Sequence, residues 1–138
     1  MVFSTKNRTP FITPDIEEKV FAHMKEQMEQ MGCPALRING MPDHVHILYL
    51  QNHRISTADV AKQVKGNTSH WINSNGLCTS RFSWQDGVRC FSVSESLVAR
   101  TKVYIENQKR HHSKITHAEE CEQLVKEFHD LQQRFSNN

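Results

Sequence analysis

The chain has 138 residues, of which 37% are hydrophobic and 23% are charged, with few glycines and prolines. This size and composition suit a domain with its own core and exclude a disordered chain. The formal net charge of +2 is too small to identify a nucleic-acid partner by itself. No apolar run approaches the roughly 18 residues that indicate a membrane span. The N-terminus lacks an apolar signal core, so we expect a cytoplasmic protein whose four scattered cysteines are free thiols.

The pattern of apolar residues predicts an alternation of strands and helices. Apolar residues at every second position indicate strands, and a spacing of three to four indicates amphipathic helices. Strands are expected over residues 2–4, 35–39 and 44–51, with a short hairpin or edge strand within 82–93. Helices are expected over 13–31, 55–73 and 94–110, and from about 116 to 135.

Capping and turn residues predict where these elements begin and end. Thr13 is expected to cap the first helix with Pro14 at its first position, and Gly32 to close it. Residues 40–43 are expected to form a turn between two strands, and Ser94 to cap the third helix. The element order predicts an α+β fold, an antiparallel sheet of about four to five strands with helices packed on its faces. We expect one domain over residues 1–138.

Two histidines separated by one residue, His44 and His46, begin the predicted strand over 44–51. Side chains alternate faces along a strand, so both imidazoles should point the same way while Val45 points into the core. Two imidazole rings about 6–7 Å apart on one face could bind a divalent metal ion together. Such a pair also occurs by chance on exposed strands. Here the following residues are apolar on both faces, and a central strand rarely places two histidines on one side without use.

Tyr104 and Gln108 are four residues apart on the predicted third helix and therefore share one face. By themselves, the two residues fit a half-buried tyrosine and a solvated glutamine without function as well as they fit a functional pair. Together with the histidine pair, Gln108 is a candidate third metal ligand. Two neutral imidazoles and a neutral amide oxygen suit Mg²⁺ or Mn²⁺. The ion would polarise a phosphate for in-line attack by the Tyr104 phenol, which would leave a covalent phosphotyrosine and a free hydroxyl.

Three segments, in order, carry a family resemblance that spans nearly the whole chain. Residues 41–46 (MPDHVH) and 104–112 (YIENQKRHH) resemble the two signatures of the single-tyrosine HUH transposases of small bacterial insertion sequences, the IS200-like transposase family. Residues 82–87 (FSWQDG), followed by 91–94 (FSVS), look like the segment between these signatures. Three matched segments in order are far more specific than any one of them.

The resemblance implies a ferredoxin-like or RRM-like HUH fold and an enzyme that cuts and rejoins single-stranded DNA at the ends of its mobile element. Tyr104, carried by C-terminal helices over about 95–135, would form a 5′-phosphotyrosine, with His44, His46 and Gln108 as metal ligands. The family works as a homodimer in which the tyrosine helix of one subunit can complete the other's metal site. It recognises hairpins near the element ends. Its first strand usually begins several residues before Val2, so weaker pairing is expected at that sheet edge.

Basic residues gather in several places and are candidate contacts to DNA. Lys62 and Lys65 share a polar stripe of the predicted helix over 55–73, where they could contact phosphates. Trp84 could stack on a base or pack in the core. The full set of candidate DNA-binding residues is Lys62, Lys65, Arg81, Lys109 and Arg110.

Other functions remain compatible with the same residues. One is a related HUH nuclease, such as a replication initiator, a relaxase or a domesticated repeat-processing enzyme. Another is a catalytically inert nucleic-acid-binding module, in which Tyr104→Phe would change nothing. A third is a hydrolase that uses metal-bound water, in which cleavage would survive the loss of Tyr104.

Overall fold

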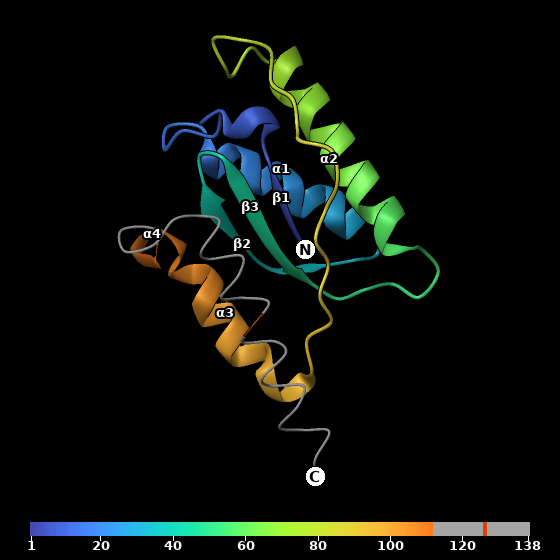
Figure 1. Cartoon of the computed structure of the whole chain (residues 1–138). Helices are drawn as coiled ribbons and strands as arrows, with labels where there is room; N and C mark the ends of the chain where they lie inside the picture. Colours follow the sequence, from blue (N-terminus) through green and yellow to red (C-terminus); the bar gives the residue numbers. More distant parts are fainter. Residues whose placement is uncertain (112–125, 127–138) are drawn as a thin grey trace. The chain divides into compact units, whose positions relative to one another are not determined.

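The computed structural model describes residues 1–111 and residue 126, and Figure 1 shows how their elements are arranged. Three strands and two long helices come first, and shorter helices follow. In chain order the elements are β1 (Val2–Ser4), η1 (Lys6–Arg8), α1 (Glu17–Gln30), β2 (Ala35–Met41), β3 (His44–Tyr49), α2 (Thr57–Ser74), η2 (Glu95–Leu97), α3 (Val98–Glu106) and α4 (Gln108–His111).

The chain divides into two compact units, Met1–Gln108 and Lys109–Asn138. All elements from β1 to α3 belong to the first unit. The predicted helix from about 116 to 135 and Cys121 lie outside the described residues, and a single domain over 1–138 stays a prediction. Cys33, Cys78 and Cys90 are free thiols. Within the described residues, no helix is both long and apolar enough to cross a membrane.

The sheet has the strand order β1-β3-β2, and both pairings are antiparallel. The central strand is therefore β3, which carries the histidine pair. The α+β class with an antiparallel sheet is confirmed. The predicted count of about four to five strands is wrong for the described residues, where the sheet has three. The short β1 nevertheless pairs over its whole length, with Val2 opposite His46 and Ser4 opposite His44.

The strand predicted within residues 82–93 is replaced by two isolated bridges to the first residues of the chain. Val2 pairs with Arg89, and Thr5 pairs with Trp84. The two bridges are three residues apart in the N-terminal segment and five residues apart in the segment 84–89. The extra residues of the second segment therefore bulge out and interrupt the hydrogen-bond ladder. Gly87, whose φ is 92°, lies in this bulge. The mismatch in spacing explains why the segment lines the sheet edge without becoming a strand.

The sheet separates two environments, which Figure 1 shows as α1 and α2 on one side and α3 on the other. α1 packs against β2 and α2, and α3 packs against β2 and β3. Because side chains alternate along β3, Val45 and Ile47 enter the core under α1 and α2, and His44 and His46 face the α3 side. The buried core residues contributed by α1 and α2 include Val20, Met24, Met28, Val60, Val64 and Ile72.

The predicted end of α1 at Gly32 is confirmed, and the predicted cap at Thr13 is wrong. Gly32 has a φ of 69° and closes α1, where its N–H and that of Cys33 bond carbonyls of the last turn at 3.0 and 2.9 Å. Ser56 caps α2 by accepting a hydrogen bond from the Asp59 N–H at 3.1 Å. Thr13 does not cap α1, because its hydroxyl donates to the Asp15 carboxylate and a turn precedes the helix, which begins at Glu17.

The hairpin between β2 and β3 turns more tightly than predicted. Met41 pairs with His44, so the turn comprises only Pro42 and Asp43, and Gly40 belongs to β2 opposite Val45. A Cβ atom on Gly40 would lie 2.1 Å from the His44 carbonyl oxygen. Gly40 is therefore required for the close approach of the two strands beside the histidines.

We expect Gly40→Ala to push β3 away from β2 and to destabilise the protein by about 1–3 kcal/mol, the range of other overpacked sites. Urea denaturation measures the change. Gly66→Ala is the matched control, because a Cβ on Gly66 in the middle of α2 meets nothing within 4 Å. It should leave stability unchanged or raise it by about 0.5–1 kcal/mol. Equal effects of the two substitutions would contradict the role of Gly40.

The predicted helix over 94–110 is broken. A single 3-10 turn precedes α3, which ends at Glu106, and α4 begins at Gln108. Asn107 between them has φ −94° and ψ 15°, outside the helical range of its neighbours. Tyr104 and Gln108 therefore lie on the two sides of a helix break, and the spacing of one continuous helix does not relate them.

Candidate active site

The histidine pair lies at the start of the central strand and is shielded from solvent. His44 is 0% exposed and His46 is 2% exposed. Their ring centroids are 5.2 Å apart, with the ring planes at 75°. Histidine is rarely buried without a purpose, because its polar nitrogens lose water. The strand thus places two imidazoles side by side in a dry environment.

The carboxylate of Asp43 fixes the protonation of His44. The Nδ1 atom of His44 lies 2.8 Å from Oδ1 of Asp43. An ionised carboxylate only accepts hydrogen bonds, so Nδ1 must carry the proton in this pair. In the neutral ring, Nε2 then carries a free lone pair, and a metal ion would bind His44 through this atom. This carboxylate–histidine arrangement is the one that orients metal-binding histidines. Asp43 was not among the residues predicted from the sequence, although it precedes His44 directly in the turn.

The tyrosine of α3 meets the histidine pair within the same polypeptide. The ring centroid of Tyr104 lies 6.0 Å from that of His46, with the planes at 75°. Tyr104 is half-buried, and α3 holds it there by packing on β2 and β3. The structure thus brings together three of the four residues that the sequence singled out, from segments about 60 residues apart in the chain.

Gln108 follows the helix break and is fully buried. Within the residues that the structure describes, neither the oxygen nor the nitrogen of its side-chain amide has a hydrogen-bond partner. Leaving such a group unsatisfied costs about 1–3 kcal/mol per group. A buried amide oxygen in this state is suited to bind a cation. In the described part of the chain, no group of three His, Cys, Asp or Glu side chains could hold a metal ion.

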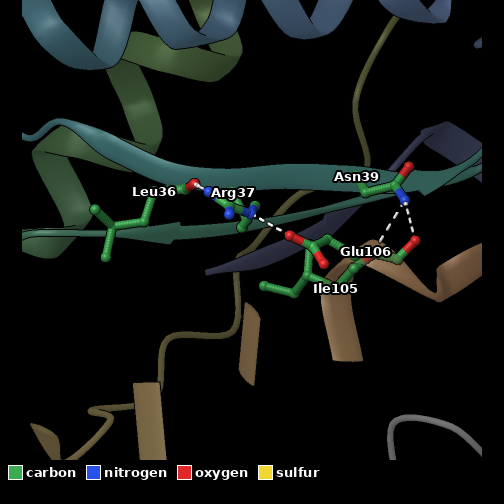
Figure 2. Close-up of polar contacts among 5 residues, drawn as sticks. All are labelled: Leu36, Arg37, Asn39, Ile105 and Glu106. Carbon is green, nitrogen blue, oxygen red and sulfur yellow. Dashed lines mark hydrogen bonds and ion pairs between the residues drawn. The ribbon is translucent and has the colours of Figure 1, made fainter. Parts of the chain in front are cut away.

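The C-terminal end of α3 is attached to β2 by side chains of two alternate residues, as Figure 2 shows. The Asn39 amide nitrogen donates to the backbone oxygens of Ile105 at 3.0 Å and of Glu106 at 3.3 Å. The Arg37 guanidinium forms an ion pair with the Glu106 carboxylate and also donates to the Leu36 carbonyl at 2.6 Å. The peptide groups between Tyr104 and the helix break are thereby fixed to the sheet.

A groove of about 1110 Å³ lies elsewhere, between α2 and residues 76–88. Lys62 on α2 and Arg81 on the facing segment are both exposed and line it. The lining is mixed in charge, because Asp86 also contributes. α2 covers the sheet face opposite the histidines, so this groove is separate from the pair. Other polar residues that line the groove include Ser69, His70, Asn73 and Gln85.

Lys65 and Trp84, which also line this groove, are held by bonds to their neighbours. The Lys65 ammonium donates to the backbone oxygens of Gln85 and Gly87, both at 2.8 Å. Burial lowers the pKa of Lys65, and the nearby charge of Asp86 opposes this. The Trp84 indole N–H donates to the Lys65 carbonyl at 2.9 Å. The ring centroid of Trp84 lies 4.7 Å from the ring centroids of both Phe3 and Phe82. The structure thus places Trp84 against the core. Lys109 and Arg110 are exposed residues of α4 and belong to the second compact unit.

Comparisons with known proteins show the family of the chain and a shared fold. Residues 1–108 match the family described as transposase IS200-like, and the chain belongs to this family. It is thus a transposase of a mobile element, a DNA-processing enzyme.

The chain also resembles a solved structure. That protein, from Deinococcus radiodurans R1, is assigned as a transposase and is 23% identical to this chain. The match covers 78% of this chain and 86% of the other, with a TM-score of 0.60. This likeness shows a shared fold. No curated protein matches the chain.

Proposed function

We propose that this transposase cuts and rejoins single-stranded DNA through a covalent bond between Tyr104 and a 5′ phosphate. The observation that carries the proposal is the Tyr104 ring 6.0 Å from His46, beside a second buried histidine whose proton is fixed by Asp43. A phenol is a weak nucleophile at neutral pH and needs a positioned, activated phosphate. A tyrosine beside a metal-binding pair satisfies that need.

The same residues suit a divalent ion. His44, His46 and Gln108 would hold Mg²⁺ or Mn²⁺, whose charge would polarise a phosphate oxygen and orient the phosphorus for in-line attack. The buried, unsatisfied amide of Gln108 supports this assignment. Asp43 would keep the proton of His44 on Nδ1.

The reaction exchanges one ester bond for another. The phenol oxygen of Tyr104 attacks the phosphorus and loses its proton to solvent. The bond from phosphorus to the 3′ oxygen breaks, and that oxygen takes up a proton to become a free 3′ hydroxyl. The phosphate remains joined to the tyrosine. Because one phosphoester replaces another, a second 3′ hydroxyl can reverse the step or transfer the strand without an external energy source.

The proposal includes partners and a compartment. The substrate would be single-stranded DNA with hairpins at the element ends. The enzyme would act as a homodimer, in which the tyrosine helix of one subunit can also serve the other. The free thiols of Cys33, Cys78 and Cys90 are in keeping with a reducing cytoplasm.

An adduct assay tests the proposal and separates it from its alternatives. The protein is incubated with labelled single-stranded DNA from its element end, with Mn²⁺ or with a chelator. We expect a protein–DNA adduct that survives denaturation and that the chelator prevents. Cleavage without an adduct would favour a hydrolase that uses metal-bound water. Binding without cleavage would favour an inert module.

The groove along α2 is the proposed path of the DNA backbone, because Lys62 and Arg81 project into it. We expect Lys62→Ala to weaken binding of single-stranded DNA and to reduce the slope of log affinity against log salt by about 0.7. Titrations by fluorescence anisotropy at several salt concentrations measure both. Lys25→Ala, an exposed lysine on α1 outside the groove, should change neither. An equal loss in the two variants would show that the groove is not the path.

A further inference from the structure

Beyond the residues of the proposed chemistry, we propose that Asn39 is a positioning residue that holds the end of the tyrosine helix on the sheet. Its hydrogen bonds to the Ile105 and Glu106 carbonyls would set Tyr104 and Gln108 relative to the histidine pair. The role in catalysis rests on the proposed function. The attachment of the helix stands on the contacts alone.

The register of the sheet places Asn39 beside the site. Asn39 of β2 is directly opposite His46 of β3. Residues directly opposite in an antiparallel pair point to the same face, with Cβ atoms about 4.5–5.5 Å apart. Asn39 therefore shares a face with His46, and from there its amide reaches α3. One side chain thus joins the strand beside the proposed ligands to the helix of the proposed nucleophile.

The two carbonyls that Asn39 binds belong to the last turn of α3. The last four carbonyls of a helix lack the regular bonds of the helix interior and carry a partial negative charge. α3 ends at Glu106, so the Ile105 and Glu106 oxygens belong to this set, and the Ile105 oxygen also accepts from the Asn107 N–H. Both peptide groups lie between Tyr104 and Gln108 in the chain. A shift of these groups would move both residues at once.

The orientation of the Asn39 amide is fixed by a second bond. Its Oδ1 atom accepts a hydrogen bond from the Gly40 N–H at 2.9 Å, so Nδ2 faces the helix. Asn39→Asp keeps the size and this acceptor but turns the donor into an oxygen that faces two carbonyl oxygens. It is therefore an isosteric test of the two bonds to α3.

The neighbouring contact supplies a control. The Arg37–Glu106 ion pair joins the same two elements, but its side chains are 45% and 49% exposed. Exposed ion pairs contribute little, because water and salt screen them. We therefore assign the positioning role to Asn39. Arg37→Ala should have a much smaller effect than Asn39→Ala on every measurement below.

Hydrogen–deuterium exchange of the α3 amides measures the attachment directly, without metal or DNA. We expect faster exchange in the last turn of α3 in Asn39→Ala and in Asn39→Asp than in the wild type. Asn73→Ala controls for a general loss of stability, because the Asn73 side chain holds the Phe82 backbone by two bonds far from α3. It should leave exchange in α3 close to the wild-type rate. Unchanged exchange in both Asn39 variants would overturn the proposal.

Mn²⁺ binding, followed by electron paramagnetic resonance, measures the consequence for the site. We expect Asn39→Ala to weaken Mn²⁺ binding by about tenfold or more, as changes around metal ligands do. DNA affinity measured without metal should not change. In a Gln108→Ala background, Asn39→Ala should add no further loss, because Asn39 acts through Gln108.

The two proposals can fail separately. If Mn²⁺ binding by the wild type requires His44 but is the same in Asn39→Ala, the positioning role is wrong and the proposed chemistry stands. If the wild type does not bind Mn²⁺ through His44, the proposed chemistry is wrong. In that case the role of Asn39 in the reaction is overturned with it, and the exchange rates of α3 still decide whether Asn39 holds the helix.

Discussion

Tyr104→Phe is expected to abolish the covalent protein–DNA adduct and all strand cleavage while leaving the affinity for single-stranded DNA unchanged. Phenylalanine keeps the ring beside His46 and removes only the oxygen that would attack phosphorus. No other group in the proposed mechanism can take its place, so the loss should be complete. Gel electrophoresis under denaturing conditions measures the adduct, and fluorescence anisotropy measures the affinity.

Tyr49→Phe is the matched control, because Tyr49 and Tyr104 are the two tyrosines of the chain. Tyr49 ends β3 and packs against the core on the face opposite the histidines. Its hydroxyl donates to the Gln51 side chain at 2.8 Å, and burial raises the pKa of Tyr49 to about 12. Its phenol therefore stays protonated at neutral pH, and Tyr49→Phe should form the adduct as the wild type does. Cleavage that survives in Tyr104→Phe would contradict the mechanism.

Replacing either histidine is expected to have the second-largest effect. His44→Gln and His46→Gln should each weaken Mn²⁺ binding by at least about 100-fold, since the loss of even a supporting partner costs 10–100-fold. The rate of adduct formation should fall together with Mn²⁺ affinity. Glutamine fills much of the imidazole volume, which limits the cavity left in these buried positions. Paramagnetic resonance of Mn²⁺ and the adduct rate at saturating DNA measure the two effects.

Asp43→Asn provides a graded comparison within the same site. The amide oxygen can still accept the His44 Nδ1 proton, but the charge that holds it there is lost. The loss of Mn²⁺ affinity should therefore be smaller than in His44→Gln. His70→Gln, at an exposed histidine of α2 in the groove, should leave Mn²⁺ affinity unchanged. Equal Mn²⁺ affinity in His44→Gln and the wild type would remove the metal site from the proposal.

The central part of the fold could be predicted because it depends on local periodicity. Alternation along residues 44–49 places His44 and His46 on one face and Val45 and Ile47 on the other whatever surrounds the strand. Tyr104 and Gln108 were candidates from their spacing on a predicted helix, and the family resemblance implied their roles. Errors arose where a residue has a role other than the one that its type most often has at such a position. Thr13 bonds Asp15 instead of capping a helix, and Gly40 serves a close strand approach although glycine usually indicates a turn.

The helix break and the supporting residues could not be predicted from one sequence. Asn107 ends α3 without the proline or glycine that would indicate a break. Asn39 reaches α3 across 66 residues of sequence, a contact that depends on the register of β2 and the docking of α3. The strand expected within 82–93 does not form for a similar reason, because its two bridges to the N-terminal residues are unequally spaced in the two segments. Each of these features depends on tertiary packing.

The most direct test of the central claim is to locate the covalent bond by mass spectrometry. The adduct formed with Mn²⁺ and single-stranded DNA is digested with nuclease and protease, and the peptide that carries the nucleotide is sequenced. We predict a nucleotide joined through its 5′ phosphate to Tyr104. A nucleotide on any other residue, or one joined through a 3′ phosphate, would contradict the proposed mechanism.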